Sequence, residues 1–256
     1  MSILHAYNPD SEPMINASHF YAPIEGFPKI AVGAFKAIEP LLAPYEPEEI
    51  IALKPVGWRT PVWRVRYKGS EIAVFHAMLG GPAAVGIMED IRAMGAEQFL
   101  FYGSCGVLDR EIATGGCILP TAAYRDEGTS YHYAPPEDDY IPVPTAAALH
   151  EILTSMDFPC VTTKAWTTDA FFRETRAAME ARRAEGCGVV DMECASIMAA
   201  AQFYDFPAYQ MFFAEDCLDA VEWDRRSMGS VPKSEQERCF ALSLEVAHQL
   251  LKGKQP

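Results

Sequence analysis

Two acidic residues follow a short apolar segment in the C-terminal half of the chain. Asp191 and Glu193 come after Val189-Val190, and small residues typical of a helix follow directly. The carboxyl ends of strands form the edge where open α/β sheets bind ligands, so this position suits a binding site. An ionised carboxylate accepts hydrogen bonds from two neighbouring hydroxyls, as on a ribose diol, which makes Glu193 a candidate sugar ligand. The alternative is an acidic residue that only stabilises the first turn of a helix.

A second acidic pair has an equivalent position further along the chain. Glu215 and Asp216 follow the apolar run at residues 209–214. Because both pairs end predicted strands of one α/β alternation, we expect them to face the same edge of the sheet. Partial burial raises the pKa of a carboxyl group, so Asp216 could donate a proton near neutral pH.

A glycine-rich segment, Gly103-Ser104-Cys105-Gly106, predicts a turn after an apolar strand. Two glycines let the backbone curl until successive amide N–H groups point at one spot, and the Ser104 hydroxyl adds another donor. Such a turn suits an anion or a ligand oxygen. The alternative is an ordinary strand-to-loop turn that needs glycine only for its conformation.

Two further segments could form the walls of a site. Phe171 and Phe172 follow another predicted strand, and either ring could stack on a planar ligand, although a Phe pair before a helix is also typical of a core. The segment 124–133 is rich in polar and aromatic residues and predicts a loop around the site; the alternative is a solvated hairpin.

Composition excludes several classes of protein. The chain has 256 residues and a formal net charge of −14, which argues against a surface that binds nucleic acid or anionic lipid. Seven Cys without CxxC or metal-ligand spacing predict reduced thiols, a cytoplasmic location and no metal site. No segment approaches the roughly 20 apolar residues of a membrane span, and the N-terminal segment does not have the pattern of a signal peptide.

The chain predicts one domain preceded by an arm. Residues 1–29 are rich in Pro, Asn and Ser and predict an irregular arm packed on the body or on a neighbouring subunit. Residues 30–256 then form the domain. Its strands and helices alternate, which indicates the α/β class. The clearest strands are predicted at residues 71–77, 98–102, 117–120, 161–166, 189–192 and 208–214, and the helices at 83–94, 145–156, 172–185, 194–204 and 234–251.

Four segments together resemble the nucleoside phosphorylase family, in the branch that holds uridine phosphorylase and the hexameric purine nucleoside phosphorylases. The first is Ala77-Met78-Leu79-Gly80-Gly81-Pro82, and the second runs from Met94-Gly95-Ala96 to the end of the glycine-rich segment at Gly106. The third begins with Tyr124-Arg125-Asp126-Glu127, and the fourth is Asp191-Met192-Glu193-Cys194-Ala195. The resemblance implies a single-domain α/β fold whose mixed sheet is partly closed into a barrel and surrounded by helices.

The resemblance also implies which residues hold the sugar. Met192 and Glu193 would bind the ribose, with Glu193 on the diol and counted with Asp216 as catalytic. A His from the neighbouring subunit's arm would meet the 5′-hydroxyl, and His5 is the best match, with His19 second.

The residues expected to bind the base do not decide between a purine and uracil. Purine-specific members have an acid at the position of Asp216 that donates a proton to the leaving base, whereas uridine phosphorylases typically lack it and carry Gln and Arg shortly after the Phe pair. Here the stretch 173–176 contains no Gln. The base-binding residues that the resemblance implies are Cys105, Gly106, Phe171, Phe172 and Asp216.

The phosphate side departs from the family pattern. The resemblance assigns phosphate to Gly33 and Ser104, and to an Arg lent across a dimer interface, which Arg59 resembles. Two further arginines of the family are replaced here by Ala37 and Phe101. Each lost guanidinium contact would weaken phosphate binding by something like 1.5 to 3 kcal/mol.

Lys36, Arg59 and Arg125 are the cations that could substitute for those arginines. The expected function is therefore a nucleoside phosphorylase, a pentosyltransferase that cleaves a purine nucleoside or uridine with inorganic phosphate to give free base and ribose 1-phosphate. The alternatives are a nucleoside hydrolase that uses water and a non-catalytic nucleoside-binding protein. No cofactor is expected, and the predicted assembly is a homo-oligomer, either a dimer or a hexamer built as a trimer of dimers.

Overall fold

A computed structural model describes residues 2–54, 59–112 and 116–253 of the chain. Its described residues form ten strands and five α-helices. The strands are β1 (Ile30–Ala34), β2 (Glu48–Leu53), β3 (Thr60–Tyr67), β4 (Ser70–His76), β5 (Gln98–Val107), β6 (Cys117–Asp126), β7 (Tyr140–Pro142), β8 (Cys160–Thr168), β9 (Cys187–Asp191) and β10 (Ala208–Cys217). The helices are α1 (Gly81–Met94), α2 (Ala146–Ser155), α3 (Arg176–Ala184), α4 (Cys194–Phe203) and α5 (Lys233–Lys252).

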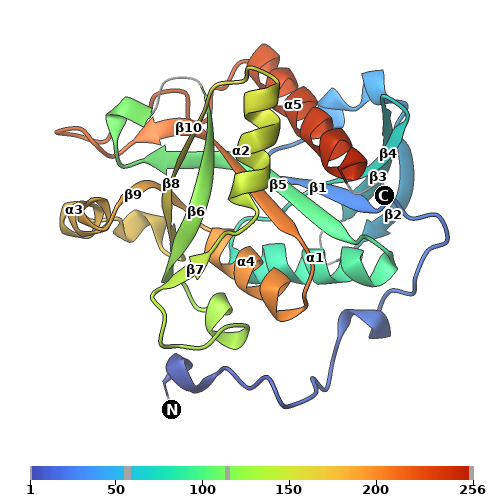
Figure 1. Cartoon of the computed structure of the whole chain (residues 1–256), viewed down its shortest axis with the longest axis horizontal. Helices are drawn as coiled ribbons and strands as arrows, with labels where there is room; N and C mark the ends of the chain where they lie inside the picture. Colours follow the sequence, from blue (N-terminus) through green and yellow to red (C-terminus); the bar gives the residue numbers. More distant parts are fainter. Residues whose placement is uncertain (1, 55–58, 113–115, 254–256) are drawn as a thin grey trace.

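All strands belong to one mixed sheet with a closed part and an open part. The order is β10-β6-β8-β9-β5-β1-β4-β3-β2, and β10 also pairs with β5, so the first five strands close into a barrel. β1 to β4 extend the sheet away from that barrel, on the right in Figure 1. This arrangement confirms the predicted single-domain α/β fold with a partly barrel-like mixed sheet.

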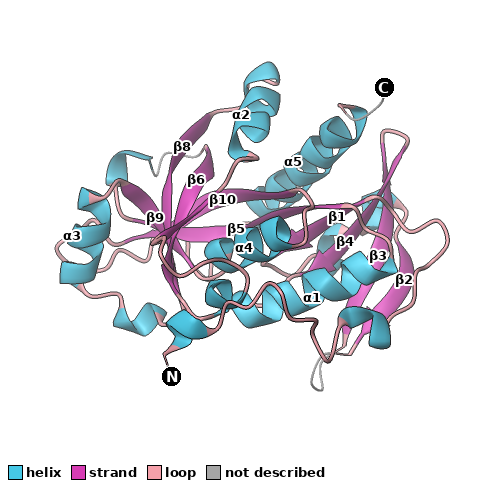
Figure 2. Cartoon of the chain, turned by 60° about the horizontal axis from the view of Figure 1, so that its bottom comes forward, coloured by secondary structure: helices cyan, strands magenta, loops and turns pink. Residues whose placement is uncertain are grey.

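The sheet is buried on both faces, which explains its nearly continuous apolar strands. Side chains alternate across β5: Phe99 and Phe101 pack toward α1 and α4, whereas Leu100 and Tyr102 pack toward α2 and α5. Figure 2 shows α1 and α4 on one face of the sheet and α2 and α5 on the other. The helices therefore cover both faces of the strands that carry the site.

Helix α1 shows how local sequence sets an element boundary. Gly80 precedes it with φ 92°, a conformation that favours glycine, and Pro82 lies in its first turn. Gly95, with φ 130°, caps its C-terminal end. The helix therefore begins two residues before the predicted start and ends where predicted.

Residues 2–29 form an arm with two short 3-10 turns at Ile3–His5 and Ala17–His19. The arm runs along the outside of the molecule in Figure 1, and its second turn contacts α1. Met14 and Phe20 are 94% and 68% exposed, so the arm leaves apolar side chains uncovered. Packing of the arm on a neighbouring subunit stays a prediction.

Candidate active site

Asp191 is the last residue of β9, and its carboxylate caps helix α4. One oxygen accepts hydrogen bonds from the backbone N–H groups of Glu193 and Cys194, at 2.9 and 2.7 Å. The other oxygen accepts a 2.7 Å hydrogen bond from the Thr167 hydroxyl. Three donors satisfy this buried carboxylate, so Asp191 stabilises the start of α4, a role that the sequence interpretation had considered for Glu193.

Glu193 is placed differently, at the N-cap position of α4. Its Oε1 accepts a 2.6 Å hydrogen bond from the Gly80 N–H, and the side chain is buried. Burial, followed by the nearby charge of Asp191, raises the pKa of Glu193, while backbone N–H groups at Gly80 and Met192 act in the opposite direction. The carboxyl group of Glu193 is therefore fixed in position beside Gly80 and Met192.

The sheet register brings the ends of β9 and β10 together on either side of Gly106. Gly106 pairs with Val190 of β9 and with Asp216 of β10. A Cβ atom on Gly106 would lie 2.9 Å from a Val190 methyl group and 3.1 Å from the Asp216 carboxylate. Burial raises the pKa of the Cys105 thiol, and the charges of Asp191 and Asp216 raise it further, because Cys105 lies between both acidic ends.

Asp216 lines a cavity of about 550 Å³ with largely apolar walls. Phe171 and Phe172 line the same cavity, with ring centroids 3.8 Å apart. They are 39% and 88% exposed, which excludes the alternative that this pair belongs to the core. Helix α3 begins only at Arg176, after the predicted start at Phe172, because Thr175 caps it by accepting a hydrogen bond from the Ala178 N–H.

Two residues of this cavity were missed at the sequence level. The Trp223 indole N–H donates a 2.7 Å hydrogen bond to the Asp216 carboxylate, and Glu174 contributes a second carboxyl to the cavity walls. Burial raises the pKa of Asp216, and the bond from Trp223 opposes that shift. A Trp in a polar loop and a Glu after the Phe pair are weak signals, because only tertiary structure brings the two segments to Asp216.

The predicted turn at Gly103–Gly106 is wrong. β5 continues to Val107, and residues 103–107 pair with β10 in a parallel ladder. The successive amides therefore belong to extended backbone and do not converge on one anion. The glycines are needed for close packing, since a Cβ on Gly103 would lie 2.9 Å from the Cβ of Phe35. Ser104 itself is exposed and open to a ligand.

Aromatic rings fill the space beside Gly33. Gly33 lies in β1, and a Cβ atom there would be 2.6 Å from the ring of Phe101 and 2.8 Å from that of Phe75. Phe101 also stacks on Phe35, with ring centroids 6.0 Å apart. The side chain that replaces a family arginine therefore belongs to a dry aromatic cluster, and Gly33 makes room for it.

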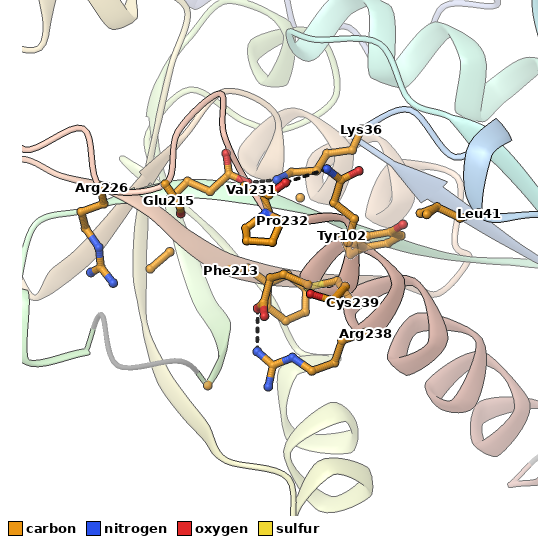
Figure 3. Close-up of a pocket in the computed structure, with 17 residues that line it drawn as sticks. Lys36, Leu41, Tyr102, Phe213, Glu215, Arg226, Val231, Pro232, Arg238 and Cys239 are labelled. Atoms are coloured by element: carbon orange, nitrogen blue, oxygen red, sulfur yellow. Dashed lines mark hydrogen bonds and ion pairs between the residues drawn. The ribbon is translucent and has the colours of Figure 1, made fainter.

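Lys36 is the predicted substitute cation that lies beside the middle of β5. It follows β1, which pairs with β5 as far as Ala34 and Tyr102, and it lines a cavity of about 290 Å³ with Tyr102. Its ammonium group forms an ion pair with Glu215, and Figure 3 shows these two side chains pointing toward each other. Desolvation lowers the pKa of Lys36. Glu215 and Asp216 line different cavities, so only Asp216 of this acidic pair lines the cavity with the two Phe rings.

The other two predicted cations lie elsewhere. The buried Arg125 guanidinium donates hydrogen bonds to Ser130 Oγ and to the carbonyl oxygens of Ala134, Pro135 and Asp138, so it holds the 124–133 segment in place. Arg59 precedes β3, three strands away from β5 in the sheet order, and forms an ion pair with Glu49. Three strand spacings amount to roughly 14 Å, too far for an Arg side chain of the same chain.

Of the other predicted sugar ligands, the structure places Met192 next to Glu193 but not His5 or His19. Met192 is partly buried next to Glu193. His5 is exposed in the first 3-10 turn, and no described contact joins it to Glu193. His19 Nδ1 accepts a 3.4 Å hydrogen bond from the Asn16 N–H, which completes a capping box.

Within the described ranges, no group of three or more His, Cys, Asp or Glu side chains could hold a metal ion. No described helix has both the length and the apolar character needed to cross a membrane. All seven cysteines are free, and six of them are buried.

Comparison with known proteins agrees with this geometry. Residues 31–252 match the model of the phosphorylase superfamily. The chain is 28% identical to a guanosine phosphorylase of Halorubrum lacusprofundi over 144 residues, which span 53% of this chain and 57% of that protein. It is 32% identical to uridine phosphorylase of Escherichia coli over 75 residues, 29% of this chain and 30% of that enzyme.

Among solved structures, the purine nucleoside phosphorylase of Toxoplasma gondii in complex with immucillin-H has the same fold. The TM-score is 0.73 at 18% sequence identity, over 95% of this chain and 98% of that one. Together with the family match over most of its length, this fold shows that the chain belongs to the phosphorylase superfamily.

Proposed function

We propose that the protein cleaves the N-glycosidic bond of a purine ribonucleoside. The observation that carries this proposal is the pair of carboxyl groups, Glu193 and Asp216, held at the ends of β9 and β10 on either side of Gly106. Glu193 lies just beyond β9 with its Oε1 held by the Gly80 N–H, and Asp216 lies in a cavity with two exposed Phe rings. The name of the guanosine phosphorylase relative agrees with this substrate class, whereas that of the uridine phosphorylase relative names a pyrimidine nucleoside.

In the proposed reaction, Glu193 and Met192 hold the ribose, with the Glu193 carboxylate on the diol. The base lies against Phe171 or Phe172, which line the cavity with Asp216, and Gly106 lies next to Asp216 with Cys105 preceding it in β5. As the bond at C1′ breaks, positive charge develops on the sugar and negative charge on the base. Asp216 donates a proton to the departing base, and a carboxyl of raised pKa suits that role.

Two contacts of the cavity residues support a purine rather than uracil as the base of the proposed substrate. A departing purine anion gains most from a nearby acid such as Asp216. Arg176, which follows the Phe pair, donates through one guanidinium nitrogen to the carbonyl oxygens of Ala220 and Val221, at 2.7 and 3.0 Å. That nitrogen is therefore occupied by the loop after β10 and does not face a uracil carbonyl.

Phosphate is the acceptor that membership of the superfamily favours. Inorganic phosphate would then be the co-substrate, bound by Ser104 and by Lys36 released from Glu215, and the products would be free base and ribose 1-phosphate. The proposal includes no other cofactor. Gly33 contributes by accommodating the aromatic cluster rather than by touching the anion.

Water is the second candidate acceptor, and one observation favours it. The position of a family arginine is occupied by Phe101, packed among Phe35, Phe75 and Phe99. Lys36 is already paired with Glu215, although Arg226 and Arg238 line the same cavity. A neutral nucleophile needs no guanidinium, so the aromatic cluster is compatible with hydrolysis.

A nucleoside panel tests the proposal. Guanosine, inosine, adenosine and uridine are each incubated with and without phosphate, and base and sugar products are separated by chromatography. Purine release with ribose 1-phosphate supports phosphorolysis, and release of free ribose at the same rate without phosphate assigns hydrolysis. Binding of nucleosides without any base release would leave the non-catalytic alternative. Asp216→Asn should lower purine release by roughly 10² to 10⁴ while binding persists.

The assembly and location complete the proposal. A homo-oligomer would cover the exposed Met14 and Phe20 of the arm and could carry His5 and Arg59 to a neighbour's site. Light scattering gives the oligomeric state, and a strict monomer with full activity would exclude those two roles. Seven free thiols support a cytoplasmic location, since reducing compartments keep cysteines unpaired.

A further inference from the structure

The base cavity holds a second carboxyl group that the reaction described so far does not use. Glu174 caps the 3-10 turn Phe171–Arg173 and lines the same cavity as Asp216 of β10. The remaining walls are mostly apolar or aromatic. They include Phe171, Phe172, Met179, Leu218, Trp223 and Met228. Two acids therefore share a poorly hydrated space around the predicted position of the base.

The two carboxyl groups have different partners. Asp216 Oδ2 accepts the 2.7 Å hydrogen bond from the Trp223 indole, which stabilises its ionised form. Glu174 donates its backbone N–H to the Phe171 carbonyl, and the effects on its carboxyl group are burial and the charge of Asp216, both of which favour its protonated form. A proton shared by the pair therefore resides mainly on Glu174.

Other charged groups around the cavity do not replace that proton. Arg176, on α3, is held by carbonyl oxygens of the loop after β10. From that loop, Arg226 lowers the pKa of Asp216 and Asp224 raises it, so the two oppose each other. Burial, followed by the charge of Asp216, raises the pKa of Glu174 to about 7. Repulsion between two carboxylates in one cavity favours a single retained proton.

We propose that Glu174 stores the proton that Asp216 passes to the departing purine, so that the two carboxyls work as a one-proton pair. This inference rests on the proposed function. As the electron pair of the C1′–N9 bond moves into the purine, the single proton passes from Glu174 to Asp216, directly or through one water, and Asp216 delivers it to N7. Both carboxyls are then ionised, and Glu174 is reprotonated from solvent after the base leaves. Glu174 is thus a positioning residue that acts through Asp216.

The test compares guanosine with 7-methylguanosine. Methylation at N7 gives the base a positive charge, so this base leaves without receiving a proton. Glu174→Gln preserves the shape of the side chain but cannot store the proton. We expect it to lower kcat for guanosine at least tenfold and to remove the decline of kcat above about pH 7, while kcat for 7-methylguanosine changes less than twofold. Glu174→Asp should restore part of the guanosine activity and its pH profile.

Glu180→Gln is the matched control, since Glu180 is an exposed residue of α3 outside the cavity, and it should behave as wild type. Thermal denaturation verifies that each variant is folded. An equal loss with both nucleosides, or an unchanged guanosine pH profile in Glu174→Gln, would overturn the inference and leave glycosidic cleavage standing. If the wild-type protein cleaves neither nucleoside, the proposed function fails and the inference fails with it.

Discussion

Substitution of Gly33 by Ala tests whether this glycine serves packing or phosphate. The new Cβ atom would lie 2.6 Å from two ring carbons of Phe101 and 2.8 Å from the Phe75 ring. Carbon atoms normally approach to 3.5–4.0 Å, so the overlap is about 1 Å. Both rings are fully buried and surrounded by other side chains, and neither can swing into solvent.

Overpacking of this kind costs about 1–3 kcal/mol, and we expect the upper part of that range because two rings are affected. For a chain of this size, the melting temperature should then fall by roughly 4 to 12 °C. Phe101→Leu removes the overlapping ring atoms at some cost of its own. The double variant should therefore be more stable than the sum of the two changes predicts, by about 1–2 kcal/mol.

Urea denaturation at one fixed protein concentration gives the four free energies of unfolding, since an oligomer's stability depends on concentration. Gly86→Ala is the matched control. Gly86 lies in α1, and a Cβ atom there would meet no neighbouring side chain within 4 Å, so this change should be neutral or stabilise the helix by up to about 1 kcal/mol. Additivity of Gly33→Ala and Phe101→Leu to within about 0.5 kcal/mol would refute the packing role.

Three further predictions concern pH, loop structure and base binding. The pKa of Glu193 is raised in the folded state, so the unfolded chain binds fewer protons above about pH 4.5 and the free energy of unfolding falls as pH rises. Glu193→Gln should flatten this dependence of the free energy of unfolding between pH 5 and 8. An unchanged slope in the variant would contradict the raised pKa. Arg125→Met should cost about 3 kcal/mol or more in urea denaturation, because four hydrogen bonds of a buried cation are lost, whereas the exposed Arg66→Met should stay within about 0.5 kcal/mol. Phe172→Ala should leave stability nearly unchanged but raise KM for a purine nucleoside roughly 2- to 10-fold, and an unchanged KM would remove Phe172 from the base site.

Local pattern was sufficient for most of the helices and for the position of several strands. Helix α2 was predicted at residues 145–156 and observed at Ala146–Ser155, because its apolar residues recur at helical spacing. Strands β2 and β3 were not predicted: they form an antiparallel extension at the sheet edge, and their mixed polar and apolar residues resemble a loop. Glu193 and Asp216 were found from sequence because both lie where an apolar strand ends.

The rest of the site depended on which segments pack together. A glycine segment predicts a turn by its conformational freedom, but two neighbouring strands hold Gly103–Gly106 in extended backbone, where small residues are needed for close packing. Arg125 and Lys36 carry the charge that an anion site requires, yet the fold directs one to loop carbonyls and the other to Glu215.

The sequence by itself therefore determined the α/β class and the family, and it singled out the two carboxyl groups proposed for catalysis, because local periodicity and motifs of fixed spacing carry this information. Only the tertiary structure decided that Asp216 meets Trp223 and shares its cavity with Glu174, and that Phe101 fills the space beside Gly33. The physical reason is that hydrogen bonding, burial and steric overlap act between residues close in space, whatever their separation along the chain.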